Sequence, residues 1–345
     1  MAKTYKNIFP QIYDFEALYR AYLKARRGKR DQAEVLRFER DLEGELIQLQ
    51  NELIWDQYET GLYRVFEVHE PKRRIAAALP FRDRVVHHAL VAALEPIWEL
   101  RFIYHSYACR VGKGMHRGAN QAQLWLRAVQ RQHGRVYVLK ADIASYFASI
   151  DHEIMLRLLA KRVACERTLA LCAQVINSWS PGLPIGNLTS QLWANVYLHA
   201  LDEHVKHELR EHRYMRYMDD WIIVHHDKEH LHDRRRHLAN WLHDELGLRL
   251  HHKTQVFPVA AHRGRALDFL GYRIWTTHRK LRKDSVRRMN RRLKRLQHQL
   301  AAGLIDWERI NATVQSWVAH ARHANSYQIR RDVLSRVAFR RTGER

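Results

Sequence analysis

The sequence of 345 residues lacks the features of a membrane protein, of a secreted protein and of a protein held together by a cysteine-bound zinc ion. No apolar run approaches the roughly 18 residues of a membrane-spanning helix, and the first residues contain no apolar signal-peptide core. The three cysteines form no CxxC pair, which argues against a disulfide framework and a thiolate zinc site. We therefore expect a cytoplasmic protein with no membrane partner.

Acidic residues are scarce beside basic ones. The chain carries 59 Lys and Arg against 37 Asp and Glu, a formal net charge of +22 with the histidines neutral. Hydrophobic residues make up 46% and aromatic residues 10%, so the chain can build a core and is not a disordered basic tail. The excess positive charge makes a polyanion the expected partner, and we favour nucleic acid over a membrane surface.

Hydrophobic periodicity gives a coarse map of the first hundred residues. Segments 14–27 and 31–55 are rich in Leu, Glu, Arg and Gln, which predicts two helices split by a break at Gly28. Residues 63–79 alternate like two strands around a Glu-Pro turn. The apolar stretch that follows predicts a helix, which we expect Pro96 to break.

The composition changes after residue 275. Between Arg279 and Arg295 there are ten Lys and Arg against one acid, and apolar residues recur at intervals of three and four. This spacing predicts a helix with one buried stripe and a cationic face. A solvated charged face normally mixes signs, so we favour phosphate contact over simple solvation. The candidate nucleic-acid-binding residues on this helix are Arg287, Arg288, Arg291 and Arg292.

Three aspartates stand out as candidate metal ligands. The segment RYMDDWIIV, residues 216–224, predicts a β-hairpin whose tip carries Asp219 and Asp220, and Asp142 ends the predicted strand RVYVLKAD. Such carboxylates can hold two Mg²⁺ ions, or Mn²⁺ in their place, that clamp the attacking and leaving oxygens of nucleotidyl transfer. Solvated turn residues are the alternative. By contrast, Asp151 precedes the helical HEIMLRLLA and is expected to be its N-cap.

Seven ordered motifs resemble those of reverse transcriptases. The hairpin resembles the YxDD box, KADIASYFASIDH the first palm aspartate motif, and EPKRRIAAALPFRDRVVHHAL and SYACRVGKGMHRGA the fingers motifs. GLPIGNLTSQLWANVYL, LHDELGLRLHHKTQV and ALDFLGYRIW are similar to the remaining palm motifs. The resemblance implies an α+β right-hand polymerase: a helical extension over 1–58, fingers and an antiparallel palm sheet over 59–276, and a basic helical thumb over 277–345. It also implies RNA-directed DNA synthesis from template RNA, a cDNA or RNA primer and dNTPs.

The resemblance assigns roles to residues in the fingers. Lys72 and Arg74 are expected to hold the triphosphate, since a guanidinium can bind phosphate through two hydrogen bonds and an ammonium acts as a point charge. Arg73 lies between them and, on a strand, should point to the opposite face. A bulge after Pro71 would reverse this alternation, and solvation of all three basic side chains is the alternative.

Further roles fall in the palm. Phe147 lies five residues after the first aspartate, where the family places the side chain that excludes a ribose 2′-OH; a core Phe is the alternative. Lys253 matches the palm lysine proposed to protonate the pyrophosphate, with a solvated surface lysine as the alternative. Gly186 either lets the backbone approach the nucleotide or serves a turn.

The subgroup is suggested by the segment IGNLTSQ. Ile185 stands where many reverse transcriptases carry Gln, and Gln191 where they often carry Pro; both resemble the enzymes of diversity-generating retroelements. Those enzymes copy a template-repeat RNA with frequent errors at adenine and work with a small basic helical-bundle accessory protein. An antiphage-defence reverse transcriptase with its own non-coding RNA is the nearest alternative. A catalytically idle RNA-binding protein on a polymerase scaffold is a further one.

Overall fold

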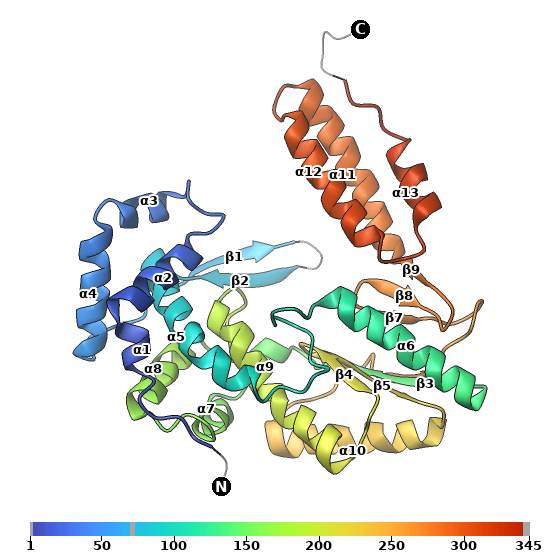
Figure 1. Cartoon of the computed structure of the whole chain (residues 1–345), viewed down its shortest axis with the longest axis horizontal. Helices are drawn as coiled ribbons and strands as arrows, with labels where there is room; N and C mark the ends of the chain where they lie inside the picture. Colours follow the sequence, from blue (N-terminus) through green and yellow to red (C-terminus); the bar gives the residue numbers. More distant parts are fainter. Residues whose placement is uncertain (1–2, 70–72, 341–345) are drawn as a thin grey trace.

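The computed structural model describes residues 3–69 and 73–340. A helical N-terminal part continues into a two-stranded hairpin, a central sheet with helices on its faces, and a C-terminal helical unit (Figure 1). This mixture of helices and antiparallel sheets is the expected right-hand polymerase fold. Among the described helices, none is long and apolar enough to cross a membrane.

From residue 3 on, where the described chain begins, the N-terminal part contains four helices. Their bounds are α1 Pro10–Tyr13, α2 Phe15–Ala25, α3 Ala33–Glu39 and α4 Leu42–Ile54. The break at Gly28 is confirmed, because this residue adopts a left-handed φ of 71°. The single helix expected over 31–55 is wrong. Asp41 starts a new helix there by accepting a hydrogen bond from the Gly44 N–H at 3.2 Å.

The fingers hairpin follows the prediction over 63–79. Strands β1 (Arg64–Val68) and β2 (Arg74–Ala78) pair antiparallel. Helix α5 then runs from Phe81 to Glu99, so the expected break at Pro96 is wrong. Proline removes one backbone donor, but only the last turn follows it, and the buried Ile97 and Trp98 hold that turn against the core.

The palm is a four-stranded antiparallel sheet in the order β4-β5-β3-β6. Its strands are β3 Tyr137–Ala141, β4 Tyr214–Tyr217, β5 Asp220–His225 and β6 Gln255–Pro258. Alternate residues face two separate apolar cores: Leu139 and Ile223 belong to one, and Val138 and Ile222 to the other. Both faces of the sheet are therefore covered, which leaves the strand ends as the place for polar chemistry.

Helices lie on both faces of this sheet. Between the fingers hairpin and the C-terminal unit, besides α5, the helices are α6 Met115–His133, α7 His152–Ala160, α8 Glu166–Asn177, α9 Leu188–Glu203 and α10 Lys228–Leu246, with the short helical turns η1 Tyr146–Ser149 and η2 His204–Glu208, and α8 packs on α7. Helix α10 packs on one face and α6 on the other (Figure 1). Asp151 is confirmed as the N-cap of α7, because its carboxylate accepts a hydrogen bond from the Ile154 N–H at 2.9 Å.

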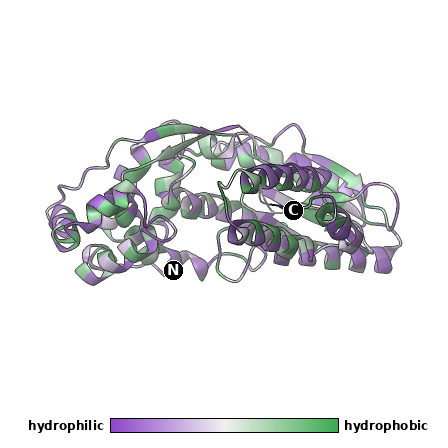
Figure 2. Cartoon of the chain, turned by 90° about the horizontal axis from the view of Figure 1, so that it is seen from above, coloured by the Kyte–Doolittle hydropathy of each residue, from purple (hydrophilic) through white to green (hydrophobic). Residues whose placement is uncertain are grey.

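The C-terminal unit joins the palm through a three-stranded sheet. The strands are β7 Leu267–Phe269, β8 Tyr272–Ile274 and β9 Arg279–Leu281, and the helices are α11 Lys283–Ala301, α12 Trp307–Ala321 and α13 Tyr327–Leu334. The stripe expected on α11 is confirmed, with Met289, Leu293, Leu296 and Leu300 buried. The helices near the C-terminus accordingly show both hydrophilic and hydrophobic segments (Figure 2).

Candidate active site

The predicted hairpin is formed, and its turn has two residues. Tyr217 pairs with Asp220, so Met218 and Asp219 make the turn, and Met218 adopts a left-handed φ of 56°. Across the sheet, Ala141 pairs with Trp221, which brings Asp142 to the same end as the hairpin tip. Strand pairing thus gathers the three predicted aspartates at one end of β3 and β5.

The three carboxylates lie close enough for the charge of one to raise the pKa of another. Burial, followed by the charge of Asp142, raises the pKa of Asp219 to about 6, although Arg74 and Arg216 partly offset this. Burial also raises the pKa of Asp220 to about 7, with Lys140 opposing the rise and both other aspartates adding to it. The Nζ atom of Lys140 lies 3.3 Å from Asp220 Oδ1. The fold therefore concentrates negative charge that it only partly neutralises.

The donor set fits a divalent cation. Mg²⁺ takes carboxylate oxygens and is commonly bound through one or two carboxylates together with substrate phosphates. Asp142 and Asp219 provide such a pair, and a cation beside them would relieve the repulsion that raises the pKa of Asp219. Asp220 differs because Lys140 already lies beside it. Within the described residues, no group of three His, Cys, Asp or Glu side chains is arranged to hold a metal ion by itself.

The fingers hairpin presents Arg74 toward this charge. Arg74 is exposed on β2, and its guanidinium lowers the pKa of Asp219, so the two side chains lie within electrostatic reach. Arg73 instead donates to Glu67 on β1 through Nε at 3.0 Å and Nη2 at 2.5 Å. This different partner agrees with the expected alternation of the two arginines. Lys72 lies outside the described residues.

The loop before α9 is attached to the fingers. The Ala77 N–H of β2 donates to the Ile185 carbonyl at 2.9 Å, and Ile185 is 36% exposed. Gly186 adopts a φ of 131°, and a Cβ there would lie 2.4 Å from the Ala77 carbonyl oxygen. The close approach that requires glycine is therefore to strand β2, a reason that we did not expect from the sequence. Phe147, the predicted sugar gate, is half-buried in η1.

A basic groove of about 400 Å³ lies beside this loop. Arg64 and Phe66 of β1, Arg84 of α5 and Gly186 line it, and Lys29 is contributed by the N-terminal part. Basic side chains next to an aromatic ring form the kind of surface that binds single-stranded nucleic acid. No local pattern predicted this groove, because its walls come from segments far apart in the chain.

The segment that carries Lys253 is attached to the first aspartate through its backbone. The His251 N–H donates to the Asp142 carbonyl at 2.8 Å, and the Lys253 N–H donates to His251 Nδ1 at 3.2 Å. The Lys253 side chain is exposed. Its position near the acids is compatible with the predicted role as a proton donor, which stays a prediction.

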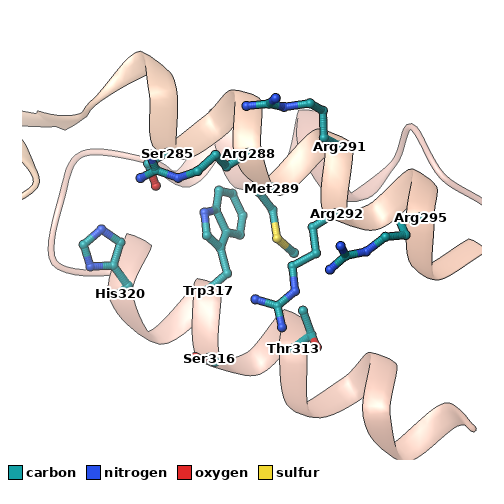
Figure 3. A pocket seen from close by; sticks show the side chains of 10 residues that line it. All are labelled: Ser285, Arg288, Met289, Arg291, Arg292, Arg295, Thr313, Ser316, Trp317 and His320. Carbon is teal, nitrogen blue, oxygen red and sulfur yellow. The ribbon is translucent and has the colours of Figure 1, made fainter. Parts of the chain in front are cut away.

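A groove of about 430 Å³ separates α11 from α12 (Figure 3). Arg288, Arg291 and Arg292 line it together with Arg295 and residues of α12, so three of the four predicted arginines share one surface. Arg287 is exposed too, but it is paired with Asp284 at 3.6 Å and does not line the groove. The cationic face expected on this helix is thus present, with Arg287 at its side.

Two residues next to the acids were missed by the sequence reasoning. Lys140 precedes Asp142 by two positions, and Arg216 precedes Asp219 by three. A charged residue inside an apolar strand such as YMRYM was the available signal, because a buried arginine needs acceptors to be tolerated. The sequence could not identify those acceptors, since they lie on other elements.

Comparison with known proteins agrees with this geometry. A family model described as reverse transcriptase (RNA-dependent DNA polymerase) matches residues 69–274. The chain is 29% identical over 134 residues to the protein YkfC of Escherichia coli K12, a match that covers 36% of this chain and 35% of that protein. It is 27% identical over 136 residues to the group II intron-encoded protein LtrA of Lactococcus lactis subsp. cremoris, with coverages of 36% and 22%. The chain thus spans about a third or less of the length of these relatives.

The fold has a counterpart among solved structures. Telomerase from Candida tropicalis, solved in complex with a TWJ fragment of telomeric RNA, aligns with a TM-score of 0.54 over 85% of this chain and 59% of the telomerase chain. Sequence identity is 12%, so this similarity concerns the fold alone. Because the family model covers more than half of the chain and includes all three aspartates, this chain belongs to the reverse transcriptase family.

Proposed function

We propose that the chain is an active RNA-directed DNA polymerase that copies an RNA template into cDNA. The observation that carries this proposal is the gathering of Asp142, Asp219 and Asp220 at one end of β3 and β5, within a reverse transcriptase fold. Two bound Mg²⁺ ions, or Mn²⁺ in their place, would activate the primer hydroxyl and stabilise the leaving pyrophosphate. Asp142 and Asp219 would hold them, while Asp220 shares its charge with Lys140.

Residues around the acids have matching roles in this proposal. Arg74, on the fingers side of Asp219, binds the triphosphate of the incoming dNTP together with Lys72. Phe147 excludes the ribose 2′-OH, and Lys253 donates a proton to the departing pyrophosphate. The basic grooves beside Gly186 and on α11 bind the template RNA and the primer.

Asp219→Asn tests the proposal. This substitution removes one charge and leaves the shape of the hairpin tip, so extension of a primer on RNA should be abolished while RNA binding is retained. Asp244→Asn is a suitable control, because Asp244 is 70% exposed on α10. Primer extension in Mg²⁺ by Asp219→Asn at the wild-type rate would contradict the assignment. Absence of extension by the wild-type protein on any primed RNA would favour an idle RNA-binding protein.

We further propose that the enzyme belongs to a diversity-generating retroelement and works with a small basic helical-bundle protein. The supporting observation is Ile185, which presents an exposed hydrocarbon side chain at the loop joined to β2. An apolar side chain discriminates by only about 1–3 kcal/mol, whereas satisfied polar contacts can discriminate much more. Errors should therefore be frequent, and the family resemblance places them opposite template adenine.

Sequencing of cDNA made on one mixed-sequence RNA tests this subgroup. Ile185→Gln should lower misincorporation opposite adenine more than opposite the other bases, because the amide can hydrogen-bond to a correctly formed pair. If the wild type copies adenine as faithfully as guanine, the retroelement proposal fails. The antiphage-defence reverse transcriptase then becomes the better interpretation, and the polymerase proposal is unaffected.

A further inference from the structure

Arg216 is a charged residue with no exposed surface. It lies on β4, and its side chain and that of its partner Asp202, at the end of α9, are both 0% exposed. A guanidinium has five N–H groups, and each of these five has an acceptor. The hydrogen bonds run from Nε to Asp202 Oδ1 at 2.8 Å, from Nη2 to Asp202 Oδ2 at 2.6 Å and the Asn195 carbonyl at 3.4 Å, and from Nη1 to Asn195 Oδ1 at 3.1 Å and the Met218 carbonyl at 3.0 Å.

Stability alone does not account for this arrangement. Removing each of two charges from water is energetically costly, and an apolar replacement of a buried ion pair is often as stable or more stable. Burial alone would lower the pKa of Arg216, but the Asp202 carboxylate overrides this and holds the pKa above its ordinary value. Arg216 is therefore charged, and its Nη1 lies 3.0 Å from the carbonyl of Met218 in the hairpin turn.

The bond to Met218 connects this network to the acids. Met218 is the first residue of the turn, and its left-handed φ of 56° is unfavourable for a side chain with a Cβ. Its carbonyl belongs to the peptide group that leads into Asp219. Fixing the carbonyl fixes the plane of that peptide and the place of the Asp219 Cα in it, so φ of Asp219 is the one backbone rotation left between this plane and the start of the side chain. The charge of Arg216 also reaches the Asp219 carboxyl, whose pKa it lowers.

We infer that Arg216 is a positioning residue that, supported by Asp202 and Asn195, holds the Met218–Asp219 peptide so that the Asp219 carboxylate faces Asp142. What the two carboxylates then hold rests on the proposed function. The orientation itself belongs to the metal-free chain. Two further contacts brace the network from outside: the Tyr214 hydroxyl donates to Asp202 at 2.7 Å, and the Asn195 amide donates to the Ala108 carbonyl at 2.9 Å.

Arg216→Lys is the first test. Lysine keeps the charge and can pair with Asp202, but its single ammonium lacks the second nitrogen through which the guanidinium donates to the Met218 carbonyl. The matched control is Arg26→Lys, because Arg26 follows α2 in the N-terminal part and donates to the Tyr22 hydroxyl at 2.7 Å and to Glu39 at 2.8 Å, a similar group that contains none of the three aspartates. Expected results are faster amide hydrogen exchange over residues 217–220 in EDTA and a drop in Mn²⁺ affinity of about 10–100-fold. Turnover should fall while KM for dNTP is unchanged, and the control should match the wild type in all three measurements.

A second variant covers the case in which the Arg216→Lys protein does not fold. In Arg216→Gln with Asp202→Asn, both buried charges are removed and the two amides can bond to each other, while the bond to Met218 is absent. Wild-type exchange over 217–220 and wild-type Mn²⁺ affinity, measured by electron paramagnetic resonance, in either folded variant would overturn the inference. If the wild type binds Mn²⁺ in an Arg216-dependent way but does not polymerise, the proposed function fails and the positioning role stands.

Discussion

Asp219→Asn should raise the stability of the metal-free protein as well as abolish its activity. The wild-type carboxylate is partly buried, lies near Asp142, and is only partly neutralised by Arg74 and Arg216. Unfolding brings this group into water and relieves the repulsion. Asparagine has nearly the same shape and carries no charge, so the folded state of the variant lacks this unfavourable term.

The magnitude follows from the pKa. A rise from 3.8 to about 6 corresponds to at most about 3 kcal/mol in favour of the neutral form, at 1.36 kcal/mol per unit. For a chain of 345 residues the unfolding entropy is about 0.7 kcal/mol/K, so the expected increase in Tm is up to about 4 °C.

The direction of the pKa shift determines how the stability difference between variant and wild type changes with pH. In the wild type the folded-state pKa lies above the unfolded value, so folding is weakened as pH rises from about 4 to about 6 and stays weakened above that. The variant lacks this titration. Its stability advantage should therefore be full at pH 8, shrink as pH falls through about 6, and vanish near pH 4.

Thermal denaturation in EDTA at pH 4, 5, 6 and 8 measures this difference. Asp244→Asn, which removes an exposed carboxylate, should leave Tm within about 1 °C of the wild type. Addition of Mg²⁺ should stabilise the wild type more than Asp219→Asn, because a ligand stabilises only the state that binds it. A folded Asp219→Asn protein with a lower Tm than the wild type at pH 8 in EDTA would refute the reasoning.

Two further predictions concern nucleic acid and nucleotide. Replacing Arg288, Arg291 and Arg292 with Gln should weaken template–primer binding for all sequences and make the slope of log K against log salt shallower by up to about 0.9 for each phosphate that is no longer neutralised. Arg287→Gln, outside the groove, should change this slope less. If the triple variant has the same slope as the wild type, the arginines of α11 are solvated and do not contact phosphate. Phe147→Ala should raise ribonucleotide incorporation relative to deoxynucleotide incorporation, since it opens space beside the sugar C2′. An unchanged ratio in a folded Phe147→Ala protein would reject the gate.

Local patterns predicted much of the site. The hairpin tip follows from two strand-forming runs around adjacent acids, and the buried stripe of α11 follows from apolar spacing, because both depend on residues near one another in the chain. Pro96 shows where local rules fail. Proline disfavours a helix interior, but burial of Ile97 and Trp98 continues α5 past it.

Partners that lie far apart in the chain could not be predicted. Arg216 was visible as a charge in an apolar strand, but Asp202 and Asn195 approach it only when α9 packs under β4. Likewise, the neighbour that requires glycine at position 186 is a carbonyl of β2, about a hundred residues earlier. Such contacts depend on the packing of whole elements, which no window of the sequence contains.

The attachment of Ile185 and Gly186 to β2 couples movement of the fingers hairpin to movement of the loop before α9. The Ala77 N–H donates to the Ile185 carbonyl, and the Ala77 carbonyl lies where a side chain on Gly186 would be. A rotation of the hairpin relative to the palm must therefore either carry the loop with it or break this bond. As long as the bond holds, the hairpin and the loop move together, so a substitution elsewhere on β2 that shifts the Ala77 backbone also shifts residue 185.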